Sequence, residues 1–381
     1  MNAMEKISSN LRNRVSDLKE QKREGRKIIG YIPGKYLPEE LILACGATPV
    51  PVSIFRGGDH EAVLISGAYH PRWLDTFCRA QIGYKMLSEE AVYQMIDILI
   101  APITDTNTRA IADGWEYYTD LEIFRFGVPH RKTERALNYY LDGLNLFKEK
   151  LEVLTGTTIT DEALKEAIDL CNRERRLFRE INVMRKSETV PISSLDFVTL
   201  NHSSFIADKR FMVDALEELV SELKTKQDSA PGGQRILFTG STLALGDYTI
   251  FRLIEEAGGT VVTEEFAEGL RPYEVDVPAN GDLMRSLAES YFTNQVCTAF
   301  FRPGRERLDY LVDLSKEFKV DGVIWYQMMY RDSYDLESYY FPQILKKGAD
   351  VPMLKIETDY DSAETGQFRT RIETFIETTR R

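Results

Sequence analysis

The sequence predicts an α/β fold made of two parallel-sheet domains with a helical segment between them. Apolar runs of strand length alternate with helical patterns in two successive blocks, which is typical of parallel sheets covered by helices. Between the blocks, residues 134–186 follow a helical pattern almost throughout. The length of 381 residues exceeds what one core usually fills. We therefore expect an N-terminal domain over 1–190, which includes the helical segment, and a C-terminal domain over 191–381.

The N-terminal block begins with a strand over 27–32. Pro38 then opens a helix that Gly46 closes, because Pro suits the first turn of a helix and Gly its end. The helical segment is expected to break at 156–160, with Asp161 as the N-cap of its second helix. The other elements expected in this block are a strand edge over 49–52, a helix over 71–87, and strands over 96–101 and 122–128.

The C-terminal block follows a linker over 190–194. Its clearest unit is a strand over 235–240, a helix over 247–257 and a strand over 260–262. Two more strands are expected over 321–326 and 352–356, and a helix should follow Glu364.

Composition narrows the class of protein. The net charge of −12 disfavours nucleic-acid binding. No apolar run approaches the roughly 18 residues that span a bilayer, and the first two dozen residues form a charged amphipathic helix rather than a signal peptide. We expect a cytoplasmic protein that binds neither nucleic acid nor membrane.

Four cysteines are scattered along the chain at Cys45, Cys78, Cys171 and Cys297. Their dispersal argues against a disulfide framework, and the lack of a CxxC pair excludes a zinc ribbon or ferredoxin-type site. The four histidines show no metal-binding spacing either. Three cysteines are expected to be buried as small apolar residues. Cys78, close to Trp73, is the candidate for the edge of a site.

The loop over 239–242 is a candidate ligand site because it joins a strand to a helix. Backbone amides and the helix dipole favour anions at such a position. The absence of GxGxxG and of a P-loop lysine argues against the usual dinucleotide and ATP sites. A ligand role and a tight structural turn both remain open for this loop.

Charged clusters stand at other predicted strand ends. The basic groups at 130–132 and 302–307 either hold the phosphates of an acidic ligand or are solvated surface charge. Carboxylates at 357–361 either bind a hard cation or cap the following helix, and we favour capping.

Several motifs, taken together in their order, resemble the 2-hydroxyacyl-CoA dehydratase and benzoyl-CoA reductase family. They lie at 38–50, 172–176, 191–196, 235–240, 320–323 and 353–375. The resemblance covers nearly the whole chain. It implies two Rossmann-like domains, and a pair of related subunits that each hold a [4Fe-4S] cluster on three cysteines. It also implies an ATP-dependent activator that supplies one electron for ketyl radical chemistry on an acyl-CoA thioester.

The cluster ligands transfer only in part. Cys78 matches the first family cysteine. The second should follow the strand ending at 101–102, where this chain has Thr104 and Asp105, and the third should follow the strand over 321–326, where it has Tyr330 and Arg331. A guanidinium offers no free lone pair to a metal. We therefore expect a cluster that is lost or atypical.

The resemblance thus points to a subunit of an acyl-CoA dehydratase, a lyase, or of an aryl-CoA reductase, an oxidoreductase, in anaerobic metabolism. We expect it to form a dimer or heterodimer with a paralogous, cluster-bearing subunit. The acyl-CoA should bind between the domains, at Thr104, Asp105, Ser241, Tyr330 and Arg331. Two alternatives stay open: a catalytic subunit that holds a cluster on divergent ligands, and a two-lobed binding or maturation protein without redox chemistry.

Overall fold

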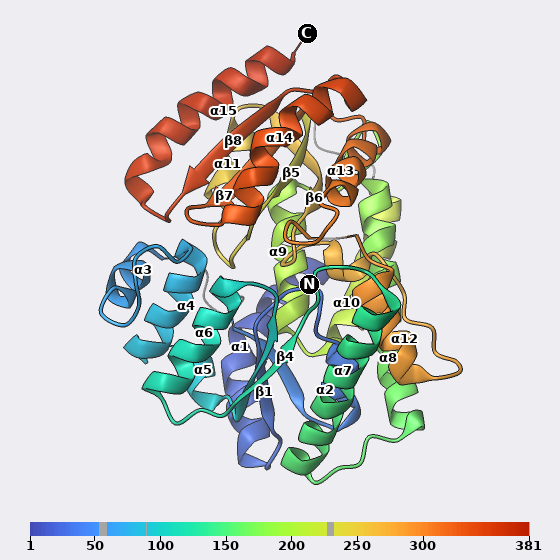
Figure 1. Ribbon diagram of the computed structural model, residues 1–381. Coiled ribbons are helices and arrows are strands. Elements are labelled where there is room, and N and C mark those ends of the chain that lie inside the picture. Colours follow the sequence, from blue (N-terminus) through green and yellow to red (C-terminus); the bar gives the residue numbers. More distant parts are fainter. Residues whose placement is uncertain (53–58, 89, 227–231, 297, 381) are drawn as a thin grey trace.

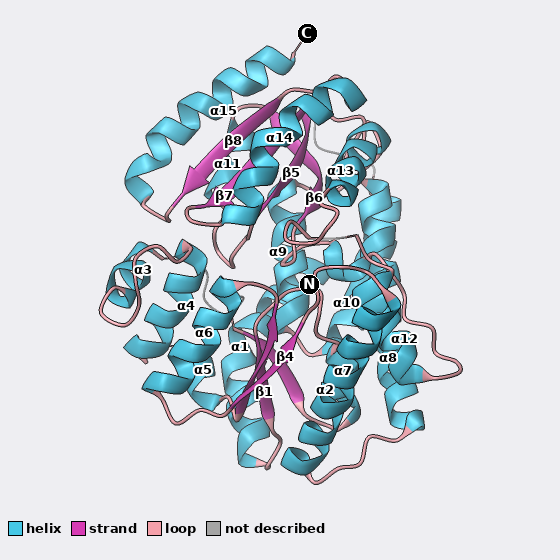
Figure 2. Ribbon diagram, in the orientation of Figure 1, coloured by secondary structure: helices cyan, strands magenta, loops and turns pink. Residues whose placement is uncertain are grey.

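The computed structural model describes residues 1–52, 59–88, 90–226, 232–296 and 298–380. It contains two four-stranded parallel sheets, one in each half of the chain, with helices packed around both (Figures 1 and 2). The predicted α/β fold with two parallel-sheet domains is confirmed. Among the described residues, no helix has the length and apolar composition that crossing a membrane requires.

The first sheet has the strand order β2-β1-β3-β4. Its strands are β1 (Ile28–Tyr31), β2 (Thr48–Pro51), β3 (Ile98–Ile103) and β4 (Ile123–Gly127). The two central strands are almost wholly buried, as expected where helices cover both faces of a parallel sheet. Gly30 is needed in β1 because a Cβ there would lie 2.7 Å from the Ile96 side chain.

The second sheet repeats this strand order as β6-β5-β7-β8. Its strands are β5 (Gln234–Gly240), β6 (Gly259–Glu265), β7 (Gly322–Met328) and β8 (Met353–Thr358). In each sheet the second strand lies at one edge beside the first strand, and the third and fourth strands lie on the other side of the first. The loops after the two central strands therefore diverge, and they leave a crevice at the carboxyl ends of the strands.

Helices form three groups along the chain. The first sheet is accompanied by α1 (Ala3–Arg23), α2 (Glu39–Ala44), α3 (His60–Ser66), α4 (Thr76–Leu87), α5 (Ala91–Met95) and α6 (Thr106–Tyr118). The helical segment consists of α7 (Glu134–Thr155), α8 (Asp161–Met184), α9 (Ser194–Ile206) and α10 (Lys209–Thr225). The second sheet is accompanied by α11 (Thr249–Glu256), α12 (Leu283–Ala288), α13 (Arg305–Glu317), α14 (Asp332–Ala349) and α15 (Thr365–Thr379), with short helices η1 (Arg271–Tyr273), η2 (Glu289–Thr293) and η3 (Ser362–Glu364).

The apolar core links the two halves. One cluster of buried side chains includes Leu99 and Trp115 from the first half and Phe238 and Ile324 from the second. A separate cluster packs the N-terminal helix α1 against α8, α9 and α10. Removal of this much apolar surface from water is the main force that holds the halves together.

The helical segment is longer than predicted. The sequence indicated helices over 134–186, and the structure adds α9 and α10 before the second sheet begins. Periodicity did not reveal α9 because it is buried on several sides, with polar Asn201, His202 and Ser203 among its buried residues. Such a helix has no clean alternation of polar and apolar faces.

Two predicted helix starts are corrected by the caps. The helix expected over 71–87 begins at Thr76, because the Asp75 side chain accepts the backbone N–H of Cys78 and so starts the first turn there. In α8 the N-cap is Thr160 rather than Asp161, since the Thr160 side chain accepts the N–H of Ala163.

Candidate functional site

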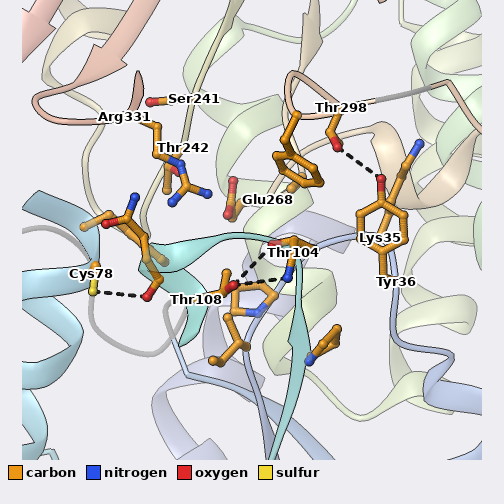
Figure 3. Close-up of a pocket in the computed structure, with 18 of the residues that line it drawn as sticks. Lys35, Tyr36, Cys78, Thr104, Thr108, Ser241, Thr242, Glu268, Thr298 and Arg331 are labelled. Carbon is orange, nitrogen blue, oxygen red and sulfur yellow. Dashed lines mark hydrogen bonds between the residues drawn. The ribbon is translucent and has the colours of Figure 1, made fainter. Parts of the chain in front are cut away.

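A pocket lies between the two sheets, where the loops that follow their strands meet (Figure 3). Its empty space is about 590 Å³ when the volume open to bulk solvent is included. Segment 32–36 after β1, Thr104 after β3, Ser241 and Thr242 after β5, and Arg331 after β7 all line it. The pocket therefore lies at the carboxyl ends of both sheets, where α/β proteins bind ligands.

Asp105 and Arg331 occupy equivalent places in the two halves. Because the strand orders match, the loop after β3 corresponds to the loop after β7. Asp105 is the N-cap of α6, and its Oδ1 accepts the N–H of Thr108 at 2.9 Å. Arg331 stands at the same point before α14 but makes no side-chain cap. Its guanidinium is therefore free to reach the other half.

Arg331 crosses the pocket edge and binds two carboxylates of the first half. Its Nη1 lies 2.6 Å from Asp75 Oδ2, and its Nη2 lies 2.9 Å from Asp105 Oδ2. Burial raises the pKa of Asp75, although the charge of Arg331 opposes that rise. Burial by itself would lower the pKa of Arg331, but Asp105 and Asp75 together raise it above its ordinary value. Arg331 thus stays charged and ties the halves together.

Cys78 lies in the first turn of α4 and lines the same pocket, but its side chain is fully buried. Its Sγ donates to the carbonyl of Asn107 at 3.3 Å. Burial, and then the negative charge of Asp75, raise the pKa of this thiol well above its ordinary value. The thiolate is the form that binds metals. The surroundings of Cys78 therefore keep it as the neutral thiol, which does not bind metals.

The three positions that the resemblance assigns to cluster ligands do come together. Asp75 hydrogen-bonds the backbone of Cys78 and pairs with Arg331, which also binds Asp105. The donor set is one protonated thiol, one carboxylate already bound to Arg331, and one guanidinium. Within the described ranges, no group of three or more His, Cys, Asp or Glu side chains could hold a metal ion. These residues do not fit a [4Fe-4S] cluster held on three thiolates.

The loop after β5 is both a tight turn and part of the pocket. Gly240 has φ of 153°, and a Cβ there would lie 1.7 Å from the Tyr326 carbonyl oxygen. Ser241 Oγ accepts the N–H of Met328 at 3.0 Å, which fixes the turn to β7. The hydroxyl that ties the strands together therefore also borders the pocket.

Tyr330 does not line the pocket, although we expected it to. It has φ of 65° and is 50% exposed. Tyr334, four residues further on, lines the pocket instead and is buried. The left-handed backbone at Tyr330 turns the chain from β7 into α14 and directs Arg331 inward.

Sequence reasoning missed several ionisable groups of the pocket, and two of them have a pKa near neutrality. Lys35 follows β1 and is 2% exposed, and its ammonium donates to the Val296 carbonyl. Burial, followed by the charge of Arg271, lowers the Lys35 pKa to about 7. Glu268 follows β6, and burial raises its pKa to about 7. The Gly34–Lys35 step directly after the first strand was the available signal for Lys35.

The two basic clusters at 130–132 and 302–307 do not line the pocket. Arg307 is buried and binds Glu265 at 2.6 Å, and it also binds Glu337. It is therefore neither a phosphate ligand on the surface nor a solvated charge. Lys132 pairs with Glu306 at 2.6 Å, which joins the two basic segments at the surface.

The acidic segment 357–361 and the described cysteines other than Cys78 have structural roles. Asp361 accepts the N–H of Ala363 at 2.9 Å and caps η3, and Asp359 accepts the N–H of Asp361 at 3.1 Å. The acidic segment thus orders the loop and caps the short turn η3, whereas α15, the helix that it was expected to cap, has no side-chain cap. Cys45 and Cys171 are buried as expected, whereas Cys297 lies outside the described residues.

The fold and the pocket define a two-domain α/β protein with a pocket at the strand ends between its parallel sheets. Residues 35–379 match the family described as 2-hydroxyglutaryl-CoA dehydratase, D-component. The chain belongs to this family, which confirms the resemblance inferred from the motifs.

Named relatives match over nearly their whole length. The chain is 26% identical to the (R)-phenyllactyl-CoA dehydratase beta subunit of Clostridium sporogenes, over 95% of this chain and 94% of the relative. It is 25% identical to one of the benzoyl-CoA reductase subunits of Thauera aromatica, over 92% of this chain and 90% of the relative. It is 24% identical to the beta subunit of the (R)-2-hydroxyglutaryl-CoA dehydratase of Acidaminococcus fermentans, over 94% of each. All three relatives are subunits of dehydratase or reductase complexes.

Proposed function

We propose that this chain is a subunit of a 2-hydroxyacyl-CoA dehydratase or benzoyl-CoA reductase-type complex in the cytoplasm. In this proposal it binds the acyl end of a CoA thioester in the pocket between the sheets. Family membership and the names of the relatives support the class of complex. The place of the pocket at the strand ends supports the ligand site. Of the binding residues proposed from the sequence, Thr104, Ser241 and Arg331 line the pocket and Asp105 pairs with Arg331, whereas Tyr334 takes the place proposed for Tyr330.

We further propose that the chain has no [4Fe-4S] cluster of its own. The observation that carries this is the Arg331 guanidinium, bound to Asp75 and Asp105 at the place of the third ligand. The proposal assigns the one-electron chemistry of the family to a paralogous, cluster-bearing subunit served by an ATP-dependent activator. This chain then contributes acyl-CoA binding and a scaffold.

Iron analysis tests the cluster proposal. After anaerobic purification of the isolated chain, we expect iron and sulfide far below the stoichiometry of a cluster, because thiolate ligands are lacking. A brown, oxygen-labile protein with about four irons per chain would contradict this. That result would favour the alternative of a catalytic subunit with divergent ligands.

Copurification tests the partner. We expect a paralogous subunit to copurify with the tagged chain, and acyl-CoA conversion to require that subunit and its activator. A chain that isolates alone and binds no acyl-CoA would favour the alternative of a binding or maturation protein.

A further inference from the structure

Glu268 is a buried carboxyl group that, among the described residues, has no counter-ion. It lines the pocket and is 4% exposed. Among the described residues, it makes no ion pair within 4.0 Å, and its side chain accepts one hydrogen bond, from Leu243 N–H to Oε2 at 3.4 Å. That distance is long for such a bond. In Figure 3, Glu268 is drawn between Arg331 and Thr298.

The cations nearest to Glu268 are already neutralised. Arg331 binds Asp75 and Asp105, and Arg271 binds Glu265 at 2.5 Å. A buried carboxylate without a counter-ion is costly, and burial accordingly raises the Glu268 pKa to about 7. The neutral carboxyl group can donate a hydrogen bond, which a carboxylate cannot.

We propose that Glu268 is a specificity-determining residue of the pocket. Its carboxyl group hydrogen-bonds an uncharged polar group of the acyl chain, as a donor while it is neutral and as an acceptor once it is ionised. The ionised form rejects acyl groups that carry a second carboxylate. This inference rests on the proposed function, because it takes the acyl end of a CoA thioester as the ligand. A carboxylate on that ligand would be repelled by ionised Glu268 and would find both arginines occupied, whereas an amide or hydroxyl group could donate to the ionised Glu268 or accept from the neutral one.

The pKa values of the other titratable groups around Glu268 show which of these groups could produce the same pH dependence. Arg271 of η1 and Arg331 before α14 remain charged. Burial lowers the pKa of His202 on α9 to about 4, and burial raises that of Tyr360 after β8 well above its ordinary value. Lys35, after β1, shares the pocket and has a pKa near that of Glu268, at about 7. Variants must therefore distinguish Glu268 from Lys35.

Calorimetric titration of the full-length chain with two matched thioesters tests the proposal. The first is glutaryl-CoA, whose acyl chain ends in a carboxylate, and the second carries an amide in place of that carboxylate. We expect the amide to bind about tenfold more tightly near pH 8, because like charges juxtaposed in a site repel. Glu268→Gln should remove most of this preference. Glu256→Gln, which removes an exposed carboxylate paired with Arg369 on the surface, is the matched control and should retain it.

The pH dependence gives a second readout. In the wild type the preference for the amide thioester should increase from about pH 6 to about pH 8 as Glu268 ionises. In Glu268→Gln the preference should not change over this range. Lys35→Met should keep the increase. If Glu268→Gln does not fold, Lys35→Met decides: a retained increase supports Glu268, and a lost increase assigns the preference to Lys35 and overturns the proposal.

The failures are distinguishable. Equal binding of the two thioesters by the wild type, or a preference that survives Glu268→Gln, overturns the role of Glu268 and leaves the proposed function standing. If neither thioester binds the wild type, the proposed function fails and this inference fails with it.

Discussion

One guanidinium, that of Arg331, holds two carboxylates that belong to the opposite half of the molecule. The Asp75 side chain is 1% exposed, so it needs the charge of Arg331 beside it to stay ionised. Loss of one partner from a buried ion pair leaves the other charge uncompensated, which is the costly case. The position is thus a strut between the halves as well as part of a pocket.

Arg331→Ala should lower the free energy of unfolding by about 3 kcal/mol near neutral pH. Burial already raises the Asp75 pKa in the folded state, and loss of Arg331 should raise it further. A carboxyl with a raised folded pKa gives stability at low pH that is lost as pH rises through that pKa. The defect should therefore be smaller in acid than at neutral pH. Urea unfolding at several pH values measures this.

Arg305→Ala is the control for that measurement, since Arg305 pairs with Asp309 on the exposed side of α13. It should cost little, because surface ion pairs contribute only about 0–1 kcal/mol. A pH-independent defect in Arg331→Ala would show that Asp75 is not its cause.

Individual site residues were predictable where they follow a strand. Thr104, Ser241 and Arg331 could be placed at the carboxyl ends of the two sheets because apolar runs mark where strands end, although their binding of substrate stays a prediction. Lys35 and Glu268 could not be assigned, because their burial depends on the other half folding over them. The Asp75 partnership was also invisible, since it joins residues 256 positions apart.

At the level of elements, the strands were the most predictable part. Continuous apolar runs such as β7 are buried along their full length, and short turns with Gly or Pro bound them. Helix α9 was not predictable, since its buried polar residues obscure the pattern. That helix nevertheless connects to the second sheet through a side chain: His202 Nδ1 lies 2.7 Å from the Tyr248 hydroxyl just before α11.

The His202 contact should make the α9 packing sensitive to acid. Burial lowers the His202 pKa to about 4, from an ordinary value of 6.5. A base with a depressed folded pKa gives stability above its unfolded pKa that is lost as pH falls toward the folded one. This amounts to at most about 3 kcal/mol between about pH 6.5 and about pH 4. Urea unfolding should show this loss in the wild type and a shallower pH slope in His202→Gln.

His60→Gln provides the matched control on α3, where the side chain is partly exposed. It should leave the pH slope as in the wild type. Identical slopes for the wild type and His202→Gln would rule out His202 as the acid-sensitive group.

At the scale of the whole molecule, the two sheets and the helices between them agree with the predicted architecture. The predicted domain boundary near residue 190 stays a prediction. Apolar contacts cross between the halves, and α1 packs on the helical segment. Sequence patterns report local periodicity, and such long-range packing leaves no local trace.

Exposed tyrosines on α14 bear on assembly. Of the aromatic residues near 326–341, Tyr326, Tyr334 and Phe341 are buried in the chain's own core, whereas Tyr339 and Tyr340 are 73% and 55% exposed. Tyrosine is enriched in interface cores. We expect a dimer or heterodimer by size-exclusion with light scattering, through a contact of at least roughly 1,000 Å².

The double variant Tyr339→Ser with Tyr340→Ser should weaken that association without a change in thermal unfolding. Tyr117→Ser, at a more exposed tyrosine on α6, is the control and should associate normally. A wild-type chain that is strictly monomeric and active alone would contradict both the pairing and the proposed loss of the cluster.

The identical strand order of the two sheets has a consequence for the history of the chain. Two halves with one topology are what duplication of an ancestral unit would leave, and each half would then have begun with the same residue before its corresponding helix. Today those places hold an acid, Asp105, and a base, Arg331, which attract each other at 2.9 Å. Because these two equivalent places carry opposite charges, the two halves attract each other at this point.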